Sequence, residues 1–147
     1  MLKKEPELKM PVSHLVEINT VPFKFKHFKH LLDLLESNNY PDLHSITMKT
    51  LPKVGYITYL GDQPIAAGFL RRLEPCFAQI DTLVSNKMFG SQVRHSGIEK
   101  VVDSLLDDAK RLKLKGIVAH TADQGILDRA KSIGFHIVNQ VIIAKPL

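Results

Sequence analysis

Residues 76–119, which read CFAQIDTLVSNKMFGSQVRHSGIEKVVDSLLDDAKRLKLKGIVA, decide the order of elements in this chain. Residues 76–85 are rich in β-branched and apolar side chains and predict a strand. Residues 85–97 read as a loop, and apolar residues then recur at the helical period from Ile98 to Leu112. Gly116 is placed to end this helix, and residues 117–120 form a short apolar strand. Strand, helix and strand in this order predict two parallel strands joined by a helix.

On the N-terminal side, the sequence predicts an antiparallel meander. Residues 54–60 and 64–72 have strand composition, and a turn signal at 61–63 separates them. Before them we expect a first strand over 12–20 and a helix that packs Phe25 and Phe28 onto the core.

On the C-terminal side, Asp123 is a candidate N-cap for a helix that runs to Ile133 and is closed by Gly134. Residues 135–144 are β-branched again and predict a last strand. The fold class is therefore α/β (α+β), with residues 1–11 as a polar lead-in and 12–147 as a single domain.

Composition excludes several classes of protein. The chain has 147 residues, 44% hydrophobic and 24% charged, as in ordinary globular domains. Its single cysteine, Cys76, excludes a disulfide framework and a cysteine-based zinc site. No apolar run reaches the ~20 residues of a membrane span, and the start has no apolar signal core. We therefore expect a cytoplasmic protein without a membrane partner.

The net charge of +5 favours anionic or phosphorylated ligands. The charge is spread along the chain, so we do not expect a nucleic-acid partner. The interleaved segment 23–30, FKFKHFKH, keeps a nucleic-acid-binding module as a third hypothesis. His27 and His30 have the spacing of a metal pair but no third ligand, so we expect no metal.

The segment before the long helix carries a possible phosphate motif. In Arg94-His-Ser-Gly97-Ile-Glu99, a cation and a glycine stand at a predicted helix start, where free N–H groups favour phosphate. A plain strand-to-helix connection is the alternative. The pattern resembles the Q/R-x-x-G-x-G/A motif of the GNAT superfamily of acetyl-CoA-dependent N-acetyltransferases, with Glu99 where the family has Gly or Ala. A second register, from Gln92 to Gly97, puts His95 at the earlier glycine.

Two further segments carry the same resemblance. Phe77-Ala-Gln-Ile80 is similar to the Phe-Ala-Glu-Ile segment of the histone-acetyltransferase branch, in which the Glu is the general base, whereas the amide of Gln79 cannot take a proton. Gly134-Phe135 matches a Gly-Phe pair that opens a late family strand, and Ala130 stands where many members have a Tyr. Over residues 12–146 the resemblance implies a mixed, mostly antiparallel sheet of six or seven strands, splayed between the fourth and fifth, with helices on both faces.

The resemblance also implies acetyl-CoA as co-substrate and a set of residues that hold it. The cofactor-binding candidates are Leu83, Val84 and Ser85 for pantetheine, Arg94, His95, Ser96, Gly97, Ile98 and Glu99 around the diphosphate, and Asp123.

N-acetyl transfer requires that the amine lose a proton, so a base is needed. Asp81 is the first candidate, because it shares a strand face with Gln79; an ion pair with a Lys or Arg is the alternative. His120 follows an apolar strand and could act as base or acid through water, or serve as a structural hydrogen-bonding group.

The resemblance implies direct attack, in a ternary complex, by a small-molecule amine or a protein amino group. Residues 25–45 and Tyr56 are expected to line the acceptor site, and a homodimer is compatible with the sequence. The alternative is an inactive GNAT-fold protein that binds CoA or a protein partner as a regulator. Gln79, Glu99 and Ala130 favour it, since they occupy positions that usually carry function.

Overall fold

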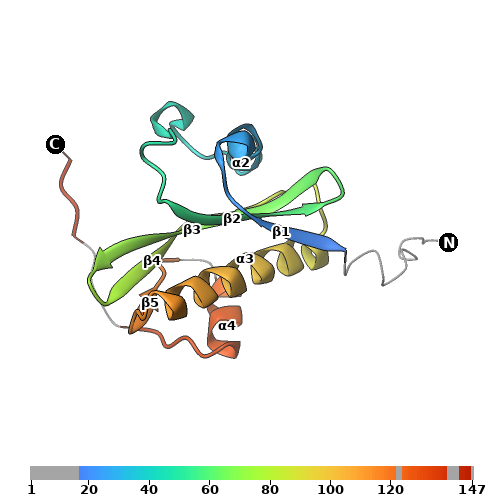
Figure 1. Ribbon diagram of the computed structural model, residues 1–147. Coiled ribbons are helices and arrows are strands. Elements are labelled where there is room, and N and C mark those ends of the chain that lie inside the picture. The colour runs from blue at the N-terminus through green and yellow to red at the C-terminus, as the bar shows by residue number, and fades with distance from the viewer. Residues whose placement is uncertain (1–16, 122–123, 139–142, 147) are drawn as a thin grey trace.

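The computed structural model describes residues 17–121, 124–138 and 143–146, and its centre is one five-stranded sheet in the order β1-β2-β3-β4-β5 (Figure 1). The strands are β1 (Ile18–Pro22), β2 (Val54–Leu60), β3 (Gln63–Glu74), β4 (Phe77–Ser85) and β5 (Gly116–Val118). The helices are η2 (Phe25–His27), α2 (Phe28–Ser37), η3 (Leu43–Ser45), α3 (Ser91–Arg111) and α4 (Gln124–Ser132).

The sheet is mixed and mostly antiparallel, as predicted. Strands β1 to β4 pair antiparallel with their neighbours, and β4 pairs parallel with β5. The sheet has five strands in the described part of the chain, fewer than the six or seven expected. Residues 135–138 and 143–144 are not in a strand, which corrects the predicted strand over 135–144 wherever the structure describes it. No described helix combines the length and apolar character that a bilayer span requires.

Strand β3 is the centre of the fold, and helices cover both of its faces. Its residues 65–70 are all buried, as expected of a strand packed on two sides. On one face, α3 packs Val101 and Leu105 against the sheet. On the other face, α2 packs three leucines, Leu31, Leu34 and Leu35. Figure 1 shows α2 and α3 on opposite sides of the sheet.

The start of α3 differs from the prediction. The helix begins at Ser91 with Gly90 as N-cap, and not at Ile98. Gly97, which we read as a loop glycine, is buried inside the helix: a Cβ there would lie 2.5 Å from Ile65 Cγ2 and 3.1 Å from Thr58 Oγ1. The glycine therefore lets α3 approach β2 and β3 closely. Residues 91–96 contain a single apolar side chain, Val93, so the first turns of the helix show no apolar repeat in the sequence.

The first helical segment also differs in which side chains it buries. Phe25 is 75% exposed, whereas His27 is buried. Residues 25–27 form a 3₁₀ turn, and His27 Nδ1 accepts the Lys24 N–H at 2.9 Å. The tighter turn rotates Phe25 away from the core, so the prediction that Phe25 packs inward is wrong.

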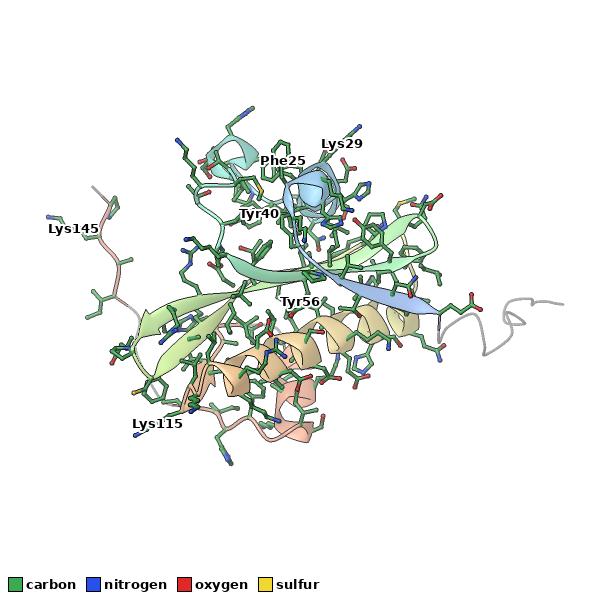
Figure 2. All side chains as sticks on the ribbon, viewed as in Figure 1. Phe25, Lys29, Tyr40, Tyr56, Lys115 and Lys145 are labelled. Atoms are coloured by element: carbon green, nitrogen blue, oxygen red, sulfur yellow. The ribbon has the colours of Figure 1, made fainter. Side chains whose placement is uncertain are left out.

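Tyr56 packs on the α3 side of the sheet, and not with the residues around α2. Its hydroxyl donates to Asp108 Oδ2 on α3 at 2.6 Å, and Asp108 also pairs with Arg111. Figure 2 shows Tyr56 on the α3 side of the sheet and Phe25 with Lys29 beyond α2. Tyr56 therefore links β2 to α3 and lies on the other side of the sheet from α2, so Tyr56 and residues 25–45 do not share one surface; whether either lines an acceptor site stays a prediction.

Candidate active site

Strands β4 and β5 separate soon after they meet. Their parallel pairing covers Phe77↔Gly116, Ala78↔Ile117 and Gln79↔Val118 and then ends, while β4 continues to Ser85. The separation lies between the fourth and fifth strands, as the resemblance implied. Among the described residues, no strand lies beside the backbone of β4 beyond Gln79 on this side.

A bulge in β4 contributes to the separation. Asp81 pairs with Phe69 and Val84 pairs with Ala67, so Thr82 and Leu83 together face the single residue Gly68. Thr82 has a φ of 53°, in the left-handed region that β-branched residues rarely adopt. A Cβ on Gly68 would lie 2.8 Å from Leu83 Cδ1, so this glycine makes the room that the bulge needs.

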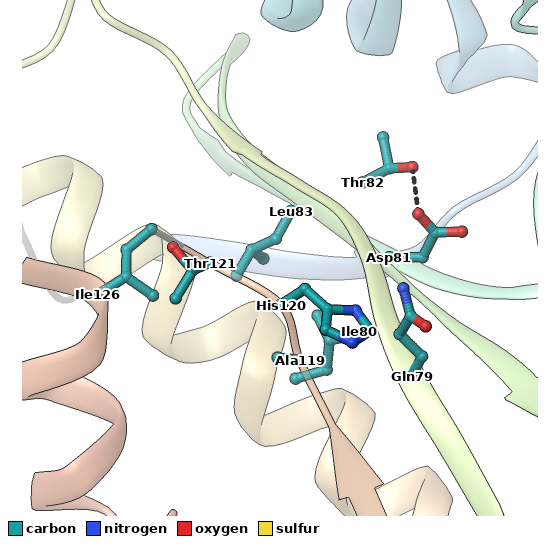
Figure 3. A pocket seen from close by; sticks show the side chains of 9 residues that line it. All are labelled: Gln79, Ile80, Asp81, Thr82, Leu83, Ala119, His120, Thr121 and Ile126. Carbon is teal, nitrogen blue, oxygen red and sulfur yellow. Dashed lines mark hydrogen bonds between the residues drawn. The ribbon is translucent and has the colours of Figure 1, made fainter. Parts of the chain in front are cut away.

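A cleft of about 260 Å³ lies where the two strands part (Figure 3). Residues 79–83 of β4 form one wall, and residues 119–121 after β5 with Ile126 of α4 form the other. The cleft brings together the two residues proposed for proton transfer, Asp81 and His120, and places Gln79 beside them.

Asp81 has the ion pair that we named as its alternative role. Arg71 Nε donates to Asp81 Oδ2 at 2.6 Å, and Thr82 Oγ1 donates to Asp81 Oδ1 at 3.1 Å. Both oxygens of the carboxylate are thus engaged. The His120 side chain is exposed and makes no hydrogen bond with a described residue. Of the two, His120 is the side chain without a hydrogen-bond partner among the described residues.

The loop from β4 to α3 is held in a defined shape by Asn86. The Asn86 N–H donates to Ile65 O at 2.6 Å and its Nδ2 donates to Pro64 O at 3.0 Å. Its Oδ1 accepts the Met88 N–H at 2.9 Å, which is an Asx turn. This residue was missed in the sequence, although an Asn four residues before a helix-capping Gly is a readable turn signal.

The free N–H groups of α3 belong to residues 90–93. The Arg94 N–H already donates to Gly90 O at 3.1 Å, so the four N–H groups before it are those without an intrahelical acceptor. Together with the helix dipole they form an anion-binding terminus. Sequence reasoning placed this terminus one to two turns too late.

The predicted diphosphate residues therefore lie within the first turns of α3. His95, Ser96 and Ile98 are half-buried there and Glu99 is exposed. Their N–H groups lie inside the helix, where they bond to the preceding turn. Arg94 is different, because its Nε is buried and has no hydrogen-bond partner among the described residues. A buried donor of this kind fits an anionic ligand at the start of α3.

The predicted pantetheine residues divide among three environments. Leu83 lines the cleft, and the Val84 side chain is buried in the core on the α2 face. The Ser85 carbonyl accepts a hydrogen bond from Asn38 Nδ2 at 2.7 Å. Asp123 lies outside the described residues.

Solved acetyltransferases share this fold. A GNAT-family acetyltransferase from Streptococcus pneumoniae superposes with a TM-score of 0.69 over 88% of this chain and 99% of its own, at 13% identity. This protein has the GNAT fold. A Mycobacterium tuberculosis protein in complex with CoA matches it with a TM-score of 0.67 over 86% of this chain and 76% of the other, at 17% identity.

A third GNAT-fold neighbour has an aminoglycoside bound. It is an aminoglycoside acetyltransferase from an uncultured soil metagenomic sample, in complex with sisomicin. Its TM-score is 0.69 at 14% identity, over 88% of this chain and 95% of the other. No protein-family model and no curated protein sequence matches the chain.

Proposed function

We propose that this protein is an acetyltransferase that transfers the acetyl group of acetyl-CoA to a primary amine. One observation carries the proposal: β4 forms one wall of the β4–β5 cleft, and the chain that leaves β4 at Ser85 reaches the N-terminus of α3 at Ser91. Leu83 lines the cleft, β4 ends at Ser85, and the free N–H groups follow at 90–93. A thioester-bearing chain in the cleft and an anion at the helix terminus could thus belong to one ligand.

The residues of the chain fit the two parts of acetyl-CoA. The N–H groups of residues 90–93 and the Arg94 guanidinium would hold the phosphates, because both offer unpaired donors. Backbone groups of β4 beyond Gln79 would hold the pantetheine arm, because no strand in the described part of the chain pairs with them on this side. When bound, acetyl-CoA supplies the activated acyl group.

Direct attack by the amine is the mechanism that we propose, because the cysteine of the chain is badly placed for a covalent intermediate. The sequence has one cysteine, Cys76, and it lies in the β3–β4 turn, beside the residues where β4 and β5 are still paired. The cleft begins beyond that paired segment, so Cys76 is at the wrong end of β4 to take the acyl group. The amine itself is then the nucleophile.

His120 is the group proposed to accept the proton from the amine. It lines the cleft, is exposed, and forms no hydrogen bond with a described residue. Asp81, held by Arg71 and Thr82, is proposed to act as a fixed negative charge that favours an ammonium group entering the cleft. The metagenomic neighbour, an aminoglycoside acetyltransferase in complex with sisomicin, is consistent with this class of substrate.

A CoA-binding protein without catalysis is the second candidate. Gln79 in the cleft cannot accept a proton, and Asp81 is engaged in an ion pair. This candidate shares the cofactor site with the first and differs only in turnover.

Two measurements separate these candidates. Calorimetric titration with acetyl-CoA tests the cofactor site, and release of free CoA thiol in the presence of a panel of primary amines tests turnover. Binding with amine-dependent thiol release supports the acetyltransferase. Binding without release supports the regulator, and no binding at millimolar acetyl-CoA would contradict both.

A further inference from the structure

Arg71 is held rigidly beside the cleft. It lies diagonally across from Asp81, since Arg71 pairs with Gln79 and Phe69 pairs with Asp81. Its Nε donates to Asp81 Oδ2 at 2.6 Å and its Nη2 donates to Thr50 O at 3.0 Å. These two bonds fix the plane of the guanidinium on both sides.

Part of the Arg71 guanidinium remains available. A guanidinium has five N–H groups, and two of them are used by Asp81 and Thr50. The others have no acceptor among the described residues, and the side chain is 45% exposed. The result is a preoriented fork of donors next to the wall of the cleft, a geometry that suits a carboxylate.

The charges around Arg71 favour an anion. Lys49 neighbours Thr50, and Lys53 directly precedes Val54, which pairs with Leu70 next to Arg71. Both lysines are exposed. Asp81 is the carboxylate in contact with Arg71, and Glu74 lies further along β3 at the exposed hairpin. Arg71 and the two lysines of the adjoining segment 49–53 thus add three cations near β3, against the one carboxylate that Arg71 already pairs, and this balance favours an anion beside Arg71.

The next residue, Arg72, provides a natural comparison. Its Nη2 donates to Pro75 O within its own hairpin at 2.8 Å. Successive side chains of a strand point to opposite faces, so Arg72 projects away from the face that carries Arg71. The same residue type one position along thus has a local structural role and no place at the cleft.

We propose that Arg71 selects acceptor amines that carry a carboxylate beside the amine, the chemistry of an amino acid. The free N–H groups of Arg71 would hold the carboxylate while the amino group lies in the cleft near His120. This inference rests on the proposed acetyl transfer and names the class of its acceptor. Amines of similar shape without a carboxylate are the poorer substrates.

The experiment compares matched acceptors on the full-length protein. L-phenylalanine is paired with 2-phenylethylamine and L-leucine with 3-methylbutylamine, and the N-acetyl products are quantified by mass spectrometry. We expect kcat/KM to be at least tenfold higher for each amino acid than for its decarboxylated partner. Arg71→Gln should raise the KM of the amino acids about tenfold and remove the preference, whereas Arg72→Gln should keep it.

The ratio between acceptor classes is the decisive readout. Arg71→Gln also removes the hydrogen bonds to Asp81 and Thr50, so kcat/KM is expected to fall for amino acids and for amines alike. Only the loss of a carboxylate contact changes the ratio of kcat/KM between the two classes of acceptor. Arg71→Lys keeps the charge without the fork and should restore part of the preference. An equal loss for both classes would overturn the inference and make Arg71 a positioning residue for Asp81.

Failure of the inference is distinguishable from failure of the proposed function. If the wild-type protein acetylates both classes equally, the inference is overturned and the acetyltransferase stands. If calorimetry shows acetyl-CoA binding but neither class is acetylated, the inference and the transfer reaction are both overturned and the cofactor site stands. If acetyl-CoA does not bind, the acceptor preference, the transfer reaction and the cofactor site are all overturned.

Discussion

Replacement of Arg94 by methionine should stabilise the free protein and weaken its binding of acetyl-CoA. Arg94 Nε is buried and has no hydrogen-bond partner among the described residues. A buried donor left without an acceptor costs about 1–3 kcal/mol, and methionine keeps much of the stem while removing that donor. The free energy of unfolding should therefore rise by up to about 1–3 kcal/mol, an increase in Tm of about 2–9 °C.

The same substitution should have the opposite effect on the ligand complex. If Arg94 donates to a phosphate oxygen, its loss removes a charge-assisted hydrogen bond of about 1.5–3 kcal/mol. The Kd for acetyl-CoA should then rise about 10- to 150-fold. Urea unfolding of the free protein and calorimetric titration with acetyl-CoA measure the two effects separately.

The control for Arg94→Met is Lys110→Gln. Lys110 is an exposed cation near the other end of the same helix, so its loss changes the net charge equally without touching the helix start. Its Kd for acetyl-CoA should stay within about twofold of wild type, because screening removes interactions over more than about 10 Å. A destabilised Arg94→Met protein with an unchanged Kd would refute the reasoning, since Arg94 would then be a structural residue.

Three further predictions follow from the fold and the cleft. Gly97→Ala should lower the free energy of unfolding by about 1–2 kcal/mol through the close contact with Ile65. Gly90→Ala, whose Cβ meets nothing within 4 Å, should lower it by only about 0.5 kcal/mol, the cost of alanine in place of glycine at an N-cap; equal effects in urea unfolding would contradict the packing role of Gly97. His120→Ala should reduce kcat about 10²- to 10⁴-fold and leave the Kd for acetyl-CoA within about twofold, and an unchanged kcat would remove His120 as the base. Burial, with Lys26, His30 and Lys24 nearby, lowers the pKa of His27 below 6.5, so the contribution of His27 to stability is present above pH 6.5 and is lost as the pH falls through the lowered pKa. His27→Gln should therefore reduce the loss of Tm between pH 7.5 and 5. An identical pH dependence of Tm in the variant and the wild type would count against this role.

The strands and their order could be predicted because the sequence pattern matches their burial. The segments 54–60, 64–72 and 76–85 are β-branched and separated by turn residues, and β2, β3 and β4 agree with them closely. The long helix could be predicted from its apolar period, but not its start. Residues 91–96 include no apolar stripe, and Gly97 read as a loop residue because nothing local shows that α3 passes close to Ile65.

The details of the site depended on tertiary contacts that the sequence does not display. The bulge puts Thr82 at a positive φ, and its only local signal is Gly68 on the facing strand. Predicting the Arg71–Asp81 ion pair would have required the register of the β3–β4 hairpin, and the sequence does not show the two register shifts in that hairpin. Asp81 was predicted from the strand face that it shares with Gln79, and His120 from its place after an apolar strand; the parallel pairing of β4 with β5 brings both to one cleft.

The most direct test of the account is calorimetric titration of the purified protein with acetyl-CoA. Adenosine, which lacks both the diphosphate and the pantetheine arm, is the control ligand. The account predicts micromolar binding of acetyl-CoA at one site and no measurable binding of adenosine, because the α3 terminus and the β4–β5 cleft supply the contacts. Absence of acetyl-CoA binding at millimolar concentration would contradict it and leave a GNAT fold without its cofactor site.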